Sequence, residues 1–139
     1  KNIGASVRNL HFNVHDRKHL LRASQEGVLF ALNYGFEIMK DLGVKAEIIR
    51  AGHANMFLSP LFREGFATVT GATVELYDTD GSQGAARGAG IGAGIYSDEQ
   101  EAFAGLEPTD RIEPNKALKK SYDEAYGNWK SELEKVVSQ

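Results

Sequence analysis

The sequence predicts an α/β fold in which a few strands are flanked by helices. Two short segments rich in apolar and β-branched residues, 46–51 and 73–77, are predicted strands. Apolar residues recur at helical spacing over residues 13–42, 59–69 and 115–137. A strand, a turn and a helix in succession is the order by which α/β proteins present a helix N-terminus to a ligand.

The first predicted helix begins at Asn13, whose side chain can cap it, and runs to Leu42. Asp16 lies in the first turn, where a carboxylate interacts favourably with the helix dipole. Gly43 follows the last apolar position, and glycine readily adopts the left-handed conformation that ends a helix. We therefore expect one long helix before the first strand.

The second predicted helix follows the strand at 46–51 and has the clearest start signal in the chain. Ser59 is suited to the N-cap, and Pro60 to the first helical position. Gly71 is suited to end this helix, after which residues 73–77 form the second predicted strand. Residues 78–81, Asp-Thr-Asp-Gly, then predict a turn.

The segment 82–96 carries glycine and alanine at intervals of four, which on a helix gives a face almost free of side chains. We expect a helix that packs closely on a sheet or a second helix, because so many glycines weaken it alone. Residues 97–114 are acidic and are predicted to be irregular. Asn115 can cap a last helix to about Val137, with an aromatic stripe on its buried face.

The composition excludes several classes of partner and site. A length of 139 residues fits one domain or part of a larger one, and the absence of an initial Met leads us to expect a fragment or processed product. The net charge of -3 argues against nucleic acid and anionic membranes as partners. No signal peptide or membrane span is visible. The absence of cysteine excludes disulfides and is compatible with the cytoplasm, where we expect the protein.

The turn between residue 51 and the helix at Ser59 is the predicted ligand site. Free N–H groups and the positive end of the helix dipole gather at such a helix start. Gly52 and Ala54 are small enough for a flat or anionic ligand to approach the backbone closely.

Two other patterns suggest sites but are better explained structurally. One pattern is His11, His15 and His19, which are spaced by four and could share a helix face. No further ligand of matching type accompanies them. We therefore favour polar residues at a helix start over a metal site. Residues 88–93 satisfy G-x-G-x-x-A, but residues 78–86 separate them from the preceding strand. A packing helix is therefore favoured over the NAD(P) site of a Rossmann oxidoreductase.

Four stretches together resemble the C-terminal domain of the FGGY carbohydrate kinases. The stretch from His15 to Gly27 is similar to the first helix of that domain. Gly52 to Asn55, followed by Ser59 to Glu64, is similar to its adenine-nucleotide motif. Gly84 to Ala89 is similar to a late G-A-A helix, and Pro114 with Tyr122 and Tyr126 is similar to the closing helix. Their order and spacing agree with the family, and within it the sequence is most similar to the bacterial xylulokinases.

The resemblance implies that residues 1–139 are the C-terminal segment of an actin-like, ribonuclease H-like nucleotide-binding domain. It implies an enzyme that transfers the γ-phosphoryl of ATP, with Mg2+, to D-xylulose. It further implies that the sugar-binding N-terminal domain with the catalytic Asp, and the first strands of this domain, lie outside the chain. We therefore expect no catalytic or metal-binding residue in this chain, and no activity of the chain alone. The implied nucleotide-binding residues are Gly52, His53, Ala54, Asn55 and Ser59.

Some residues depart from the motif of the family, usually G-G-A-x-S-P-x-W-x-Q. His53 stands where glycine is usual, and residues 56–58 look like an insertion before Ser59. Phe62 replaces the usual Trp, and Glu64 the usual Gln. These departures leave open whether Asn55 or Ser59 contacts adenine.

A second hypothesis takes the chain as a non-catalytic assembly module. An incomplete sheet exposes strand edges, and exposed edges can pair with another copy to form a homodimer.

Overall fold

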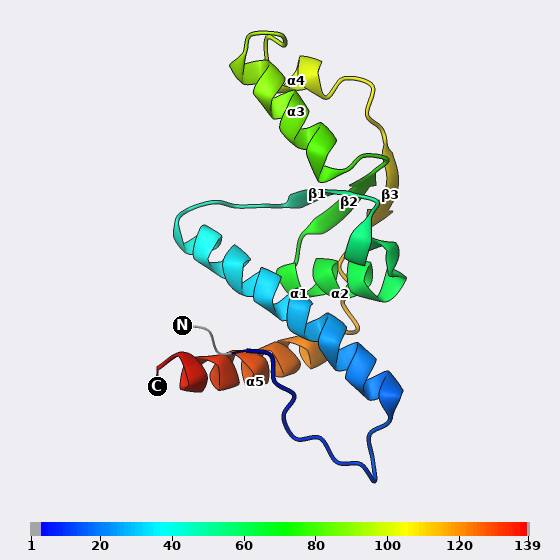
Figure 1. The fold of residues 1–139 in the computed structure, drawn as a ribbon, viewed down its shortest axis with the longest axis vertical. Helices are drawn as coiled ribbons and strands as arrows, with labels where there is room; N and C mark the ends of the chain where they lie inside the picture. The colour runs from blue at the N-terminus through cyan, green and yellow to red at the C-terminus, as the bar shows by residue number, and fades with distance from the viewer. Residues whose placement is uncertain (1–3, 139) are drawn as a thin grey trace.

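The computed structural model describes residues 4–138 and contains one three-stranded sheet. Its strands are β1 (Ile48–Gly52), β2 (Thr73–Tyr77) and β3 (Pro108–Ile112), in the spatial order β1-β2-β3. β1 is parallel to β2, whereas β3 is antiparallel to it. Helices α1, α2 and α5 gather at one side of this sheet, and α3 and α4 extend away from them (Figure 1).

Helix α1 (Arg17–Asp41) begins later than the sequence predicts. Asp16, not Asn13, is the N-cap, and its carboxylate accepts hydrogen bonds from the backbone of Lys18 and His19. The predicted cap is wrong because Asp16 satisfies free N–H groups of the first turn directly. At the other end Gly43 has a φ of 89°, the left-handed conformation that was predicted there.

Helix α2 (Pro60–Thr70) confirms both of its predicted end signals. The Ser59 hydroxyl accepts a hydrogen bond from the Phe62 N–H, and Gly71 closes the helix with a φ of 74°. A short 3-10 helix, η1 (Asn55–Leu58), precedes α2 and was not predicted. It consists of Asn55 and of residues 56–58, which look like an insertion in the sequence.

The core lies between the sheet and the three gathered helices. β2 contributes Val74 and Leu76, which are fully buried, and α2 contributes the stacked rings of Phe62 and Phe66. The core cluster consists of Leu29, Phe30, Phe62, Phe66, Ala67, Val69, Val74, Leu76, Tyr122 and Tyr126. The last two come from α5 and confirm the predicted aromatic stripe.

Strand β1 is an outer strand of this sheet. Ile49 and Ala51 are only partly buried, although they pair in register with the buried Val74 and Leu76. The difference follows from position, because within residues 4–138 β2 has a neighbour on each side and β1 has one. The side of β1 away from β2 is therefore open.

The prediction that residues 97–114 are irregular is wrong. This segment contains α4 (Glu99–Ala102), capped by Asp98, and the strand β3. β3 is held by distant contacts: Arg111 pairs with Glu75 at 2.8 Å, and Ile112 packs against the core. Contacts between residues that lie this far apart in the sequence leave no local pattern from which a strand could be predicted.

Helix α5 (Lys119–Val137) follows Leu118, so the predicted cap at Asn115 is also wrong. Asn115 instead ties the preceding segment to α2. Its backbone N–H donates to the Thr68 hydroxyl at 3.0 Å, and its side-chain amide donates to Glu64 at 2.7 Å.

Helix α3 (Gly81–Gly92) is shorter than predicted, and its glycine face is not closely packed. A Cβ built at Gly84 or Gly88 meets no atom within 4 Å. Gly90 is the exception, since a Cβ there would lie 2.7 Å from the Tyr96 ring. α3 does pack against the second helix α4, where the Arg87 guanidinium donates to the Ala102 carbonyl at 2.6 Å, but within the described residues Gly90 is the only glycine of α3 in close contact.

An ionic cluster covers the face of the sheet opposite to the core. Glu75 on β2 accepts hydrogen bonds from the Tyr77 hydroxyl at 2.8 Å, from Arg111 at 2.8 Å and from Arg50 at 3.3 Å. The Tyr77 hydrogen bond, followed by the two arginines, holds the pKa of Glu75 below its ordinary value of 4.5. This cluster links all three strands.

We expect acid to weaken the fold through Glu75. Because its pKa is lower in the folded than in the unfolded chain, its contribution to stability is complete at pH 7. That contribution begins to fall as the pH drops to about 4.5 and is lost below the folded pKa. Urea unfolding of the wild type and Glu75→Gln from pH 7 to pH 3 should show a gap in stability that closes with acid. A gap of constant size would contradict an ionic role.

Candidate functional site

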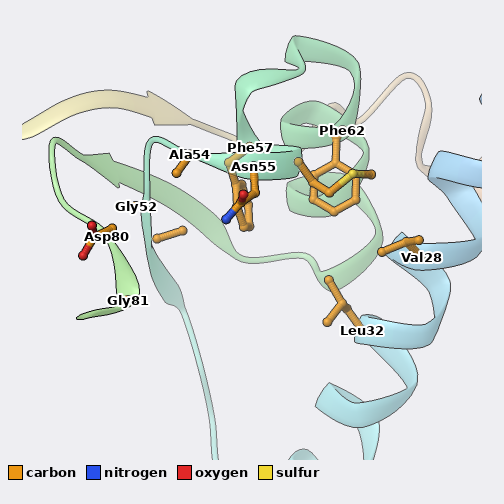
Figure 2. Close-up of a pocket in the computed structure, with 11 residues that line it drawn as sticks. Val28, Leu32, Gly52, Ala54, Asn55, Phe57, Phe62, Asp80 and Gly81 are labelled. Carbon is orange, nitrogen blue, oxygen red and sulfur yellow. The ribbon is translucent and has the colours of Figure 1, made fainter. Parts of the chain in front are cut away.

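A cavity of about 310 Å³ lies where the carboxyl ends of β1 and β2 meet the helices. In open α/β sheets this edge is where ligands usually bind. Figure 2 shows α1 on one side of the cavity, the end of β1 and the start of α3 on the other, and η1 between them. The cavity is lined by Val28, Leu32, Ala51, Gly52, Ala54, Asn55, Met56, Phe57, Phe62, Asp80 and Gly81.

The corner after β1 is shaped by backbone hydrogen bonds. The His53 N–H donates to the Tyr77 carbonyl at 2.8 Å, which keeps the end of β1 tied to β2. The Ala54 N–H donates to the Gly52 carbonyl at 2.8 Å, and the chain then turns into η1. Asn55 has a φ of 52°, a left-handed conformation that asparagine tolerates better than most residues.

Position 52 requires glycine because the backbone of another segment of the protein lies against it. A Cβ at this position would lie 2.3 Å from the Thr79 carbonyl oxygen, well inside contact distance. The small residue lets the loop after β2 lie directly against the end of β1. Sequence reasoning assigned the glycine to close approach by a ligand, and the structure shows a different and sufficient reason for it.

The structure brings three of the five predicted binding residues to the cavity. Gly52, Ala54 and Asn55 line it, whereas the exposed His53 and the partly buried Ser59 do not. Ser59 is occupied structurally: its hydroxyl caps α2 and lies 3.5 Å from the Gln25 side-chain oxygen on α1. Of the two side chains left open for adenine, only Asn55 lines the cavity.

Sequence reasoning missed the two walls of the cavity. Val28 and Leu32 lie on α1, where their spacing only indicated a helix face, and they stay 45% and 44% exposed. Asp80 and Gly81 begin α3 and were predicted only as part of a turn. The position of these two residues directly after β2 could have predicted that they lie at the site, because parallel strands bring together the segments that follow their carboxyl ends.

The cavity lining is mainly apolar, with two polar side chains. The Asn55 amide has no hydrogen-bond partner within the part of the chain that the structure describes. Asp80 is exposed, and hydrogen bonds from the Ser82 hydroxyl and then the Gln83 N–H hold its pKa below the ordinary value. Such a site can hold a flat ligand between apolar walls and orient it by hydrogen bonds.

The two disfavoured sites of the sequence have clear positions in the structure. The rings of His15 and His19 lie 5.4 Å apart, and those of His11 and His15 6.1 Å apart. Residues 4–138 hold no group of three or more His, Cys, Asp or Glu side chains that could bind a metal ion. The glycine motif at 88–93 lies late in α3, not in the turn after β2 where a dinucleotide site needs it.

The helices and sheet have the fold of part of an actin-like ATPase domain, as the resemblance implied. The chain is similar in sequence to the xylulose kinase of Haemophilus influenzae, with 28% identity over 97% of this chain. The predicted resemblance to xylulokinases is therefore confirmed. No family model matches the chain.

Solved structures of xylulose kinases share the fold. The enzyme from Brucella ovis superimposes with a TM-score of 0.79 at 25% identity, covering 96% of this chain and 28% of its own. The ligand-bound enzyme from Lactobacillus acidophilus also gives 0.79, at 18% identity over 96% of this chain and 27% of its own. The enzyme from Rhodospirillum rubrum gives 0.75 at 24% identity, over 94% of this chain and 27% of its own.

The chain spans only 28% of the length of the Haemophilus influenzae relative. The similarity therefore concerns about a quarter of a xylulose kinase. Within residues 4–138, no helix is both long enough and apolar enough to cross a membrane.

We predict that Gly52→Ala lowers the free energy of unfolding by about 1–3 kcal/mol, because the added methyl group must displace the loop at Thr79. Gly127→Ala on α5 is the matched control, since no atom lies within 4 Å of its added Cβ. That change should stabilise the helix by about 0.5–1 kcal/mol. Urea unfolding followed by circular dichroism measures both, and equal effects would contradict the close contact.

Proposed function

We propose that this chain is the nucleotide-binding, C-terminal part of a carbohydrate kinase. The complete enzyme transfers the γ-phosphoryl group of ATP to D-xylulose. The observation that carries the proposal is the position of the cavity. It is lined by Gly52, Ala54 and Asn55, which resemble an adenine-nucleotide motif. The chain that contains this motif is similar in sequence to a xylulose kinase.

The cavity suits the nucleoside end of ATP. Its volume of about 310 Å³ lies at the lower end of the roughly 300–1,000 Å³ found for small-molecule sites. Val28 and Leu32 on one wall and Phe57 in η1 offer apolar surface to the faces of a purine. The Asn55 amide can both donate and accept, as the edge of adenine requires.

The phosphates of ATP belong outside this cavity. Asp80 is the one charged side chain among the lining residues, and its ionised carboxylate repels a phosphate group. We do not assign Mg2+ to the described residues, which hold no group of three or more His, Cys, Asp or Glu side chains that could bind a metal ion. We therefore assign to this chain the binding and orientation of adenosine, and to the rest of the enzyme the sugar, the phosphates and the catalytic Asp.

The assembly-module hypothesis rests on the open edge of β1, which the structure does show within residues 4–138. The comparisons favour the kinase, because a relative and three solved structures that match nearly the whole chain are all xylulose kinases. Formation of a homodimer stays a prediction.

We predict that adenosine binds the isolated chain through the corner after β1. Titration followed by 15N NMR should shift the backbone amides of Gly52, Ala54, Asn55 and Gly81 more than those of α5. Asn55→Gly should weaken binding about two- to tenfold, the value of one neutral hydrogen bond. Glycine adopts the left-handed conformation of this residue freely, so the stability of the fold should not fall.

Cytidine is the control ligand, since it offers a smaller ring and a different hydrogen-bonding edge. Adenosine affinity unchanged by Asn55→Gly would contradict the assignment of the amide to adenine. Absence of adenosine shifts at the cavity would contradict the proposed function.

A further inference from the structure

Asp80 occupies a defined place at the mouth of the cavity. β2 ends at Tyr77, and the following loop lies against Gly52 before Asp80 starts α3. Figure 2 shows Asp80 beside Gly52, on the opposite side of the cavity from Val28 and Leu32. The backbone contact at Thr79 thus fixes the carboxylate relative to the corner that carries Asn55.

Hydrogen bonds within the chain orient the Asp80 carboxylate and leave part of its capacity to accept hydrogen bonds unused. Its Oδ1 accepts hydrogen bonds from the Ser82 hydroxyl at 2.6 Å and from the Gln83 N–H at 2.9 Å. Both of these hydrogen bonds go to the same oxygen. The Ser82 backbone N–H adds a weaker interaction with the carboxylate. Since an ionised carboxylate has about four acceptor positions on two oxygens, acceptor capacity remains for a ligand.

The chemistry of the site selects hydroxyl groups as its partners. An ionised carboxylate accepts hydrogen bonds from neutral donors and repels anions, so it favours the sugar of a nucleotide over its phosphates. In dinucleotide-binding folds, an Asp or Glu carboxylate accepts a hydrogen bond from a ribose hydroxyl in the same way. Asn55 and Asp80 therefore offer separate polar contacts for the two halves of one nucleoside.

We propose that Asp80 is a specificity-determining residue that accepts hydrogen bonds from the ribose hydroxyls of adenosine. The inference rests on the proposed function and adds to it a preference for ribonucleotides over deoxyribonucleotides. The competing explanation is that Asp80 serves only as the N-cap of α3.

Asp80→Ser separates these two roles. Serine is about as good an N-cap as aspartate, so α3 should stay capped and the melting temperature should hardly change. The shorter side chain removes Oδ2, and with it the acceptor for the ribose. Asp98→Ser is the matched control, because Asp98 caps α4 in the same way and does not line the cavity.

The test compares adenosine, 2′-deoxyadenosine and 3′-deoxyadenosine by NMR titration of the 139-residue chain. The wild type and Asp98→Ser should bind adenosine about tenfold more tightly than at least one deoxynucleoside, as a hydrogen bond to a charged group implies. In Asp80→Ser that ratio should fall towards one. The fold of each variant is checked from its melting temperature.

Two results would overturn the inference. One is equal binding of all three nucleosides by the wild type, which leaves the proposed function intact. The other is discrimination that survives in Asp80→Ser. If no nucleoside perturbs the cavity at all, the proposed function itself fails, and this outcome is distinct from both.

Discussion

The contact between Gly52 and the Thr79 carbonyl is the constraint on which the site depends. It allows the loop after β2 to lie against the end of β1, with no side chain between the two backbones. The start of α3 is thereby brought to the same cavity as the corner that carries Asn55. A larger residue at position 52 would separate these walls, so one missing side chain shapes a site built from three segments.

Local signals in the sequence predicted the elements that depend on local interactions. Ser59, Pro60 and Gly71 act within one turn of α2, and the sequence therefore predicted both ends of this helix. β3 escaped prediction because the pairing of Arg111 with Glu75 is made across the sheet. The start of α5 was misplaced because the Asn115 side chain accepts a hydrogen bond from the Ala117 N–H in a turn that precedes the helix, while its own backbone N–H donates to Thr68 on α2.

The residues of the candidate site also divide into those that a local motif selects and those whose position depends on packing. Gly52, Ala54 and Asn55 are consecutive or nearly so, and a local motif was enough to select them. Leu32 could not be selected, because its place at the cavity depends on how α1 packs against α2. Ser59 was also selected, and the structure shows its hydroxyl capping α2 and not lining the cavity. Motif resemblance thus selected the corner after β1, and packing decides which side chains line the cavity.

In the proposed enzyme this part of the chain holds adenosine while chemistry takes place elsewhere. The most direct test is to measure nuclear Overhauser contacts between adenosine and the chain in solution. The adenine protons H2 and H8 should contact the methyl groups of Ala54, Val28 and Leu32. Contacts only at another surface, such as the second cavity of about 280 Å³ beside His15 and Arg22, would contradict the assignment of the nucleotide to this corner.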